Sequence, residues 1–412
     1  MLASQAIPPN GPRTRIAVTG LGAVSAWGWG VPALREGLRS GRTAIRPFSR
    51  FDHERQRTHV AGEVPGADPL RVPGSWPRLS WADRFALFAA KEALEQAGLA
   101  PPFSPDVGVY FGTSTAGIYE SEEYLQAAWQ GRRARRDLFA SWQLNGPGDA
   151  VARALGISGP VATVSSACAS AALAIEAALS DLRAGLVEVA VAGGADSLSR
   201  LTYSGFNAMR AVDERPCRPF RADRAGMSLG EGAGVLVLES EAHAGARRAR
   251  PIAELRGAGA SCDASHMTAP QPEGRGAALA MRRALEDAGV ESDAVAFVNV
   301  HGTGTPLNDD AEARALASVF GARGARLPIT ATKASVGHLL GSAGAIEAVA
   351  AALCLREGEV HPTAGEGEPD AALAVNLVQG VPLPLPPGVA LSTDFAFGGA
   401  NAALVLGAWT AR

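Results

Sequence analysis

Apolar residues along this chain occur in short runs that end at glycine-rich or polar junctions, and longer segments rich in alanine and leucine follow them. Four of these runs are Arg15–Gly20, Val107–Gly112, Val187–Gly194 and Ala294–His301. Short runs of apolar and β-branched residues are typical of buried strands, and the segments between them are long enough for helices. Strands that alternate with helices predict an α/β protein.

The chain also contains an internal repeat. The segment AIEAAL from Ala174, which leads to Leu182-Arg-Ala-Gly, recurs as AIEAVA from Ala345, which leads to Leu355-Arg-Glu-Gly. We expect two related halves, residues 1–250 and 251–412, with the repeated helices at equivalent places. Chance similarity between alanine-rich helices is the alternative.

The junctions before the repeated helices carry reactive side chains. Cys168 lies seven residues before Ile175, and His338 lies eight before Ile346. A thiol at a helix N-terminus meets unpaired N–H groups and the positive end of the helix dipole, so we expect Cys168 to be held as a thiolate. His301 lies in another glycine-rich junction. A pseudo-twofold relation between the halves would allow a nucleophile and two imidazoles to converge.

Composition limits the class of protein. The chain has 412 residues, 47% of them hydrophobic, and a formal net charge of −3. This charge gives no reason to expect nucleic-acid binding, although the basic cluster Arg132, Arg133, Arg135 and Arg136 is either a docking site for an acidic partner or a solvated face. Without a signal-peptide core or an apolar run of about 18 residues, we expect a cytoplasmic enzyme that makes no membrane contact.

Metal and nucleotide sites are not predicted. Cys168, Cys217, Cys262 and Cys354 are far apart, which favours reduced thiols and gives neither a zinc nor a redox motif. The segment Gly20–Ser25 imitates the start of a dinucleotide fingerprint, but serine stands in place of the third glycine, and no acidic residue closes a following strand.

Four motifs follow Cys168: Gly230–Gly234 (GEGAG), His301–Asp309 (HGTGTPLND), Lys333–Gly344 (KASVGHLLGSAG) and Phe395–Asn401 (FAFGGAN). In this order they resemble the motifs of elongating, type II β-ketoacyl-[acyl-carrier-protein] synthases of the thiolase superfamily. The resemblance runs from about residue 15 to about residue 406. It implies the thiolase fold, with two pseudo-twofold-related halves in five α-β-α-β-α layers, usually assembled as a dimer.

The resemblance also implies a reaction. Cys168 would accept an acyl group from the phosphopantetheine of an acyl carrier protein, and malonyl carrier protein would then be decarboxylated to a carbanion that attacks the acyl-cysteine. The product is a β-ketoacyl thioester two carbons longer, made with no metal or organic cofactor of the enzyme's own. Neutral His301 and His338 would donate to the enolate oxygen, and the N–H groups of Cys168 and Phe397 would hold the second oxyanion.

Other motif residues receive supporting roles by the same resemblance. Lys333, five residues before His338, would fix the histidine network and supply positive charge. Glu312 would support the region of this lysine, with a solvated helix face as the alternative. Thr303 and Thr305 would hold the pantetheine arm, or only stabilise their turn.

The last motif and one loop bear on the acyl chain. Phe395 and Phe397, followed by Gly398, resemble a mobile gate over the acyl pocket, although core aromatics on a strand show the same alternation. Asn401 would tie this loop by hydrogen bonds. Thr115 stands where the family often has a bulky aliphatic residue that limits the pocket, which leaves the preferred chain length open.

Departures from the family pattern favour a specialised acyl substrate. Ser166 replaces a common threonine, and residues 119–148, which help to build the dimer in relatives, match poorly and contain Trp129 and Trp142. A polyketide or polyene pathway is therefore an alternative to ordinary fatty acid synthesis. The partner subunit is either a second copy or a paralogue.

Three other classes differ at identifiable residues. A degradative thiolase would use a second cysteine near the C-terminus, where this chain has Phe397-Gly-Gly-Ala-Asn. A chain-length factor, the non-catalytic partner of a synthase, would lack the nucleophile, and a decarboxylase-only relative would carry glutamine in its place. Cys168 argues against both, and the chain-length factor is the alternative we retain.

Overall fold

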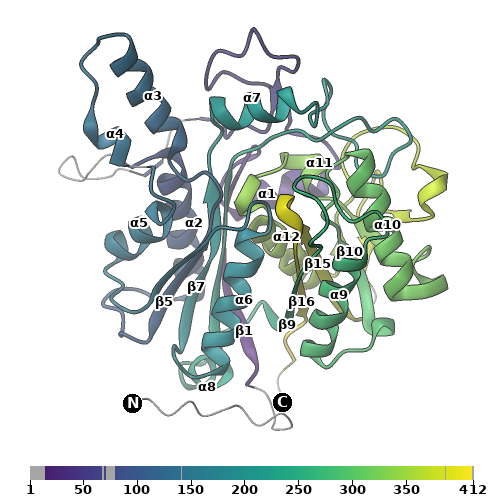
Figure 1. The fold of residues 1–412 in the computed structure, drawn as a ribbon. Coiled ribbons are helices and arrows are strands. Elements are labelled where there is room, and N and C mark those ends of the chain that lie inside the picture. Colours follow the sequence, from purple (N-terminus) through teal and green to yellow (C-terminus); the bar gives the residue numbers. More distant parts are fainter. Residues whose placement is uncertain (1–13, 67–68, 71–78, 141, 386, 411–412) are drawn as a thin grey trace.

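The computed structural model describes residues 14–66, 69–70, 79–140, 142–385 and 387–410 (Figure 1). Its main strands fall into two groups, one from each half of the chain. The first group is β1 (Ile16–Ser25), β5 (Val107–Gly112), β6 (Val161–Val164), β7 (Val189–Asp196) and β8 (Gly232–Ser240). The second group is β9 (Ala253–Cys262), β10 (Val295–Asn299), β11 (Pro328–Thr330), β15 (Val389–Phe395) and β16 (Ala400–Gly407).

The two groups have the same topology. The strands lie side by side as β6-β5-β7-β8-β1 in the first half and as β11-β10-β15-β16-β9 in the second. In each half the three strands at the outer edge run parallel, and the remaining pairs are antiparallel. Short pairing of Ile16–Val18 with Ala253–Leu255 joins the halves. The same order of five strands in both halves confirms the internal repeat.

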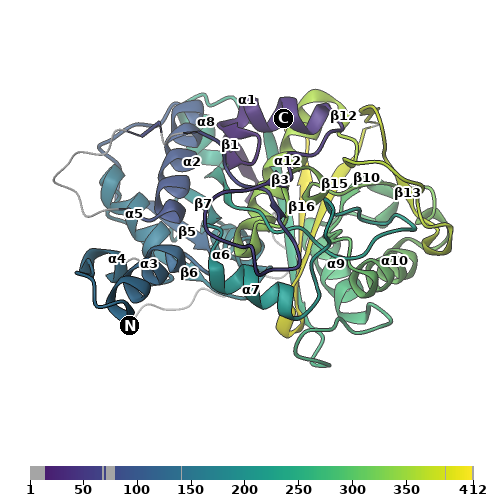
Figure 2. The ribbon, with the colours of Figure 1, turned by 90° about the horizontal axis from the view of Figure 1, so that it is seen from above.

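Helices fill three further layers. The two repeated helices, α6 (Ser170–Arg183) and α12 (Ala343–Glu357), lie between the sheets in both views (Figures 1 and 2). The outer layers are α2 (Trp81–Ala97) with α5 (Gly146–Leu155) on one side, and α9 (Arg275–Ala288) with α10 (Pro306–Phe320) on the other. The expected five-layer arrangement is confirmed.

Small residues allow the central helices to lie close to the strands. A Cβ on Gly112 of β5 would lie 2.2 Å from the backbone nitrogen of Ala171 in α6. In the second contact, a Cβ on Gly234 of β8 would lie 2.4 Å from the nitrogen of Ile346 in α12. Only glycine fits such backbone contacts, so these glycines set the position of both helices.

Shorter elements complete the fold. The additional helices are α1 (Val31–Arg39), α3 (Ile118–Trp129), α4 (Arg136–Ala140), α7 (Arg200–Ala208), α8 (Glu241–Ala246) and α11 (Lys333–Val336). The additional strands are β2 (Gly28–Trp29), β3 (Arg46–Pro47), β4 (Val60–Ala61), β12 (Glu359–Val360), β13 (Asn376–Leu377) and β14 (Leu383–Pro384). The division expected at residues 250 and 251 stays a prediction.

Candidate active site

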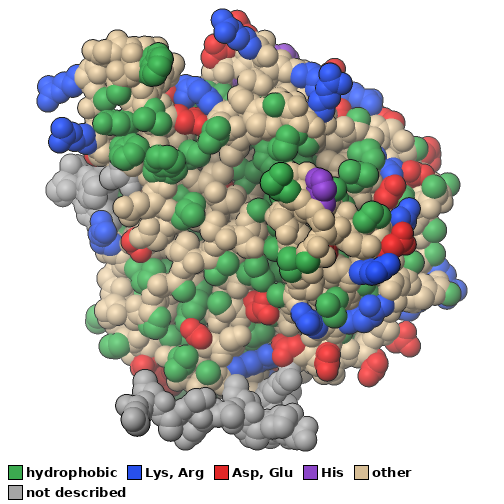
Figure 3. Space-filling model, viewed as in Figure 1, with side chains coloured by type: hydrophobic (Ala, Val, Ile, Leu, Met, Phe, Trp, Pro, Cys, Tyr) green, Lys and Arg blue, Asp and Glu red, His purple; other side chains and the backbone are tan. Residues whose placement is uncertain are grey.

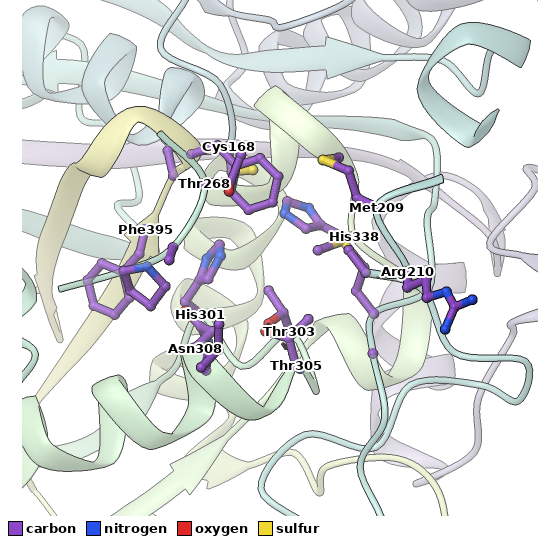
Figure 4. A pocket seen from close by; sticks show the side chains of 18 of the residues that line it. Cys168, Met209, Arg210, Thr268, His301, Thr303, Thr305, Asn308, His338 and Phe395 are labelled. Atoms are coloured by element: carbon purple, nitrogen blue, oxygen red, sulfur yellow. Dashed lines mark hydrogen bonds between the residues drawn. The ribbon is translucent and has the colours of Figure 1, made fainter. Parts of the chain in front are cut away.

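A cavity of about 410 Å³ opens where the ends of the central helices meet. Side chains from both halves of the chain line it, and Figure 4 shows Cys168, His301 and His338 turned toward one another. Cys168 comes from the first half, whereas His301, His338 and the two aromatic residues of the last motif come from the second. The sequence-predicted residues in this lining are Cys168, His301, Thr303, Thr305, His338, Phe395, Phe397 and Asn401.

Cys168 sits in a sharp turn between β6 and α6. Ala167, the residue before it, has a left-handed backbone with φ of 44°. The backbone N–H of Phe397 is directed at the Cys168 sulfur. Burial raises the pKa of the Cys168 thiol to about 11, although the charge of Lys333 and the Phe397 N–H act in the opposite direction. Loss of solvent therefore opposes the thiolate that the helix N-terminus favours, and the thiolate stays a prediction.

The hydrogen bonds of His338 define its tautomer. Its Nδ1 accepts a hydrogen bond from the backbone N–H of Leu340, at 3.1 Å. Burial, with the nearby charge of Lys333, lowers the pKa of this imidazole well below its usual range. A neutral ring that accepts at Nδ1 carries its proton at Nε2. This Nε2 has no partner among the described residues, so its N–H is free to donate to a molecule in the cavity.

His301 has the same tautomer for a different reason. Its Nδ1 lies 3.1 Å from the Lys333 Nζ. An ammonium group only donates, so Nδ1 accepts, and the ring carries its proton at Nε2. Burial and the charge of Lys333 lower the pKa of His301 well below its usual range. The two rings meet edge to face with centroids 5.5 Å apart, so the cavity holds two neutral N–H donors.

Lys333 lies behind the histidines and does not line the cavity. Its Nζ donates to Glu347 Oε1 at 2.6 Å, and the lysine is 1% exposed. Burial opposes its charge, but the carboxyl groups of Glu347 and Asp394 outweigh this effect and raise the pKa of Lys333. Lys333 therefore contacts the site only through His301.

Glu347 and Asp394 were missed by the sequence analysis. Both are buried, Glu347 in the middle of α12 and Asp394 on β15. A signal was present for Glu347, because it is the one carboxylate in the apolar stretch Ala343–Leu353 and a charge in such a stretch needs a buried partner.

Glu312 supports the histidine loop. Its carboxylate accepts hydrogen bonds from the backbone N–H groups of His301 (2.8 Å) and Gly302 (2.9 Å) and from the hydroxyl of Thr393 (3.0 Å). Burial raises the pKa of Glu312 to about 7. Its hydrogen bonds thus orient His301 from the backbone side, and none goes to the ammonium of Lys333.

The remaining predicted contacts are divided between cavity and loop. The hydroxyls of Thr303 and Thr305 are 2.9 Å apart, and both residues line the cavity. The Asn401 side-chain amide donates to Asp263 at 2.8 Å and to the carbonyl of Gly399 at 3.0 Å. Gly398 has φ of 85° and does not line the cavity, so its contribution is to the turn.

Thr115 is not part of the cavity. It is buried, and its hydroxyl donates to Asp196 at 2.8 Å. Asp196 also accepts from the hydroxyl of Thr113 at 2.6 Å. Its hydroxyl holds the loop after β5, and its expected role in limiting the acyl pocket stays a prediction.

The mouth of the cavity includes residues that carried no signal in the sequence. They are Met209, Arg210 and Leu307, all exposed. The arginine cluster Arg132, Arg133, Arg135 and Arg136 is exposed in and after the loop that joins α3 to α4, and none of its members lines the cavity. Its docking role stays a prediction.

The described residues provide neither a metal site nor a membrane-spanning helix. Across these ranges no cluster of three or more histidine, cysteine, aspartate or glutamate side chains is arranged to hold a metal ion. None of the helices that the structure describes is both long and apolar enough to cross a membrane.

Comparison with known families decides the identity. The family profile "Beta-ketoacyl synthase, N-terminal domain" matches residues 13–244, and "Beta-ketoacyl synthase, C-terminal domain" matches residues 252–366. The chain belongs to the β-ketoacyl synthase family. This synthase is 37% identical to nodulation protein E of Rhizobium meliloti, covering 95% of this chain and 98% of that protein. It is 34% identical to 3-oxoacyl-[acyl-carrier-protein] synthase 2 of Synechocystis, covering 95% and 97%.

Solved structures give the same result for the fold. The synthase is similar to the ishigamide ketosynthase/chain length factor, with a TM-score of 0.90, 34% identity and coverage of 97% of this chain and 100% of that one. It is also similar to a β-ketoacyl synthase of Burkholderia phymatum, with a TM-score of 0.89, 32% identity and coverage of 96% and 100%. The thiolase fold is confirmed. The enzyme is an acyltransferase, and members of its family use no cofactor of their own because phosphopantetheine arrives on the carrier protein.

Proposed function

We propose that this β-ketoacyl synthase forms its carbon–carbon bond with Cys168 as the acyl acceptor and with His301 and His338 as donors to the malonyl thioester. The observation that carries the proposal is the unpartnered Nε2–H of His338 in the same cavity as the Cys168 thiol. The acyl group on the cysteine must lie beside the malonyl thioester for the two to react, so the nucleophile and the N–H donor must share one cavity.

Acyl transfer is the first half of the reaction. The Cys168 sulfur attacks the thioester carbonyl of the acyl carrier protein, and the thiol proton ends on the departing pantetheine sulfur. The negative oxygen of the tetrahedral intermediate is held by the N–H groups of Cys168 and Phe397. The second of these groups already points at the sulfur, which supports this placement.

Decarboxylation is the second half. The bond between the malonyl carboxylate and the α-carbon breaks, CO₂ leaves, and the electron pair forms an enolate whose oxygen accepts from His301 and His338. The α-carbon attacks the acyl-cysteine, and collapse of the intermediate releases a cysteine thiolate that takes up a proton. Neutral imidazoles suit this step because they stabilise the enolate without a charge that would pair with the malonyl carboxylate.

The alternative, a chain-length-factor partner, fits the site less well. Such a subunit needs no nucleophile, whereas here the thiol, both imidazoles and their supporting residues Lys333 and Glu312 are all in place.

We propose that the protein assembles with a second subunit through an exposed apolar face. Hydrophobic side chains gather over α3 and α4 in Figure 3. Trp129 is 92% exposed, Trp142 48%, and Val161 on the edge strand β6 41%. One solved relative is titled as a ketosynthase in complex with its chain length factor, from Xenorhabdus doucetiae. We expect a second subunit of this fold to cover the face in the cytoplasm. Sedimentation of the isolated chain as a dimer at micromolar concentration supports a second copy, and a monomer supports a paralogue.

Intact-mass spectrometry tests the reaction. We expect carrier proteins loaded with acyl chains of different length and unsaturation to leave an adduct on the enzyme that disappears when malonyl carrier protein is added. The preferred chain separates fatty acid synthesis from a polyketide or polyene pathway. No adduct from any donor contradicts an independent condensing activity.

Arg210 should assist substrate binding at the cavity mouth. Phosphopantetheine carries a phosphate and carrier proteins are commonly acidic, so an exposed arginine on this rim favours both. We expect Arg210→Glu to lower kcat/KM for acyl carrier protein about tenfold, through KM, and to leave pantetheine thioesters without the phosphate nearly unaffected. Arg250→Glu, a substitution of an exposed arginine outside the cavity lining, is the matched control.

The double variant Arg132→Glu/Arg133→Glu tests the arginine cluster between α3 and α4. If its KM for acyl carrier protein is unchanged, the docking role of this cluster is wrong.

A further inference from the structure

Behind the two imidazoles lies a pair of buried carboxyl groups whose role the proposed reaction does not explain. Glu347 and Asp394 are 0% and 1% exposed. One oxygen of Glu347 accepts from Lys333, but no N–H or O–H group in the described part of the chain donates to Glu347 Oε2 or to either oxygen of Asp394. Buried acceptors without donors are costly, so these three atoms need an explanation.

The explanation is a shared proton. Glu347 Oε1 accepts from the Lys333 Nζ, and Asp394 Oδ1 lies 3.7 Å from His301 Nδ1, which contacts the same Nζ, so the two carboxyl groups lie together in one buried cluster. Two carboxylates cannot bond, because each only accepts, whereas a carboxylic acid donates to a carboxylate. Burial raises the pKa of both groups, that of Glu347 well above its usual range. One proton between them forms one O–H···O bond, which pairs Glu347 Oε2 with one oxygen of Asp394 and leaves the other Asp394 oxygen without a donor among the described residues.

Charge balance also favours one proton on the Glu347–Asp394 pair. The groups that surround the pair are Lys333 on α11, His301 after β10, His338 after α11, Glu312 on α10 and the Cys168 thiol before α6. Both imidazoles are neutral, and burial favours a neutral thiol. Glu312 is held separately by the backbone N–H groups of His301 and Gly302. Apart from Glu312, the ammonium of Lys333 is balanced by one negative charge that the two carboxyl groups and one proton share.

The distance between Asp394 and His301 shows why the proton matters. Asp394 Oδ1 lies 3.7 Å from His301 Nδ1, the atom to which Lys333 donates. A fully charged aspartate at this place would draw a proton onto Nδ1 and produce an imidazolium or the opposite tautomer. The neighbouring backbone leaves room for the carboxyl group, since a Cβ on Gly344 would lie 2.6 Å from Asp394 Oδ2.

We propose that Asp394 is a positioning residue: by sharing one proton with Glu347 it balances the charge of Lys333, and Lys333 in turn holds His301 with its Nε2–H toward the cavity. This inference rests on the proposed roles of the histidines in decarboxylation. Asp394 acts through other side chains and does not itself line the cavity.

Amide substitutions distinguish a shared proton from two independent carboxylates. Asp394→Asn or Glu347→Gln replaces the protonated member and leaves one carboxylate opposite Lys333, so we expect each to lower malonyl decarboxylation only about fivefold. The double variant leaves Lys333 without a counter-charge, and we expect its rate to fall at least about tenfold below the product of the single effects. A buried lysine without a partner loses its proton at neutral pH, so the double variant should regain rate as the pH is lowered.

The assay avoids the unknown acyl chain. Release of CO₂ from malonyl-pantetheine is measured in a Cys168→Gln parent, because glutamine removes the acyl acceptor and leaves both histidines. A parent without CO₂ release overturns the proposed function. If the parent releases CO₂ but the two amide substitutions act independently, only the role of Asp394 is overturned. The same holds if the double variant does not regain rate as the pH is lowered.

A second measurement does not need the double variant to fold. The infrared band of a protonated carboxyl is recorded at a pH well above the values of about 7 and about 6 to which burial raises the pKa of Glu312 and Asp309. Buried Glu231, whose pKa burial also raises, contributes equally to all three proteins. We expect a band in the enzyme that is missing from both single variants, because the remaining carboxyl of the pair is ionised in each. If either single variant keeps the full spectrum of the enzyme, the shared proton is overturned.

Discussion

Replacing Cys168 by alanine will abolish formation of the acyl-enzyme. The alanine variant has no sulfur to accept the acyl group, and the other cysteines are unsuited to replace it. Cys217 and Cys354 are buried and neither lines the cavity, so the thioester of a carrier protein cannot reach them. Intact-mass spectrometry after incubation with acyl carrier protein should show the unmodified mass, so the loss of condensation is complete rather than graded.

Cys262→Ala is the matched control for this result. Cys262 is an exposed thiol outside the cavity lining, and we expect its removal to leave the adduct in place. Thermal unfolding of the Cys168→Ala variant checks that the fold is retained. An acyl adduct on folded Cys168→Ala protein would show that another residue is the nucleophile.

His338→Ala will have the second largest effect, confined to the malonyl half of the reaction. The substitution removes the unpartnered Nε2–H that we assign to the enolate oxygen. Loss of one such donor from a buried site lowers the rate about 10²- to 10³-fold. We expect CO₂ release from malonyl carrier protein to fall by this factor, whereas Cys168 still accepts an acyl group, because its oxyanion is held by backbone N–H groups.

The control variant is His243→Ala. His243 is half-buried, its Nδ1 contacts Glu239 at 2.6 Å, and it does not line the cavity. The decarboxylation rate of this variant should be unchanged. If His338→Ala loses acyl transfer and decarboxylation equally, the imidazole serves the whole site and its assignment to the enolate is wrong.

Several features of this enzyme could be predicted from local sequence. The repeated AIEA segments at Ala174 and Ala345 and the strand-like runs before glycines placed two equivalent helices, and the same strand order in both halves bears this out. Cys168, His301 and His338 were found because each lies in a short contiguous motif. A loop that must turn sharply and present one side chain depends on its immediate neighbours, so its residues carry the information together.

Residues that act through distant partners could not be placed in this way. Asp394 on β15 and Glu347 on α12 are 47 positions apart in the sequence, and their contact is a product of packing. The hydrogen bond from the Thr115 hydroxyl to Asp196, 81 residues away, is likewise a product of packing.

The sequence by itself therefore determined the α/β architecture and its duplication, and it supplied the side chains that we propose for the reaction, because these follow from periodicity and contiguous motifs. The tertiary structure alone decided the surroundings that govern their protonation. The helix N-terminus favours a thiolate at Cys168, yet burial raises the pKa of the thiol to about 11, and burial likewise keeps both imidazoles neutral. The energy of a charge depends on how much water and which partners surround it, and only the folded chain sets both.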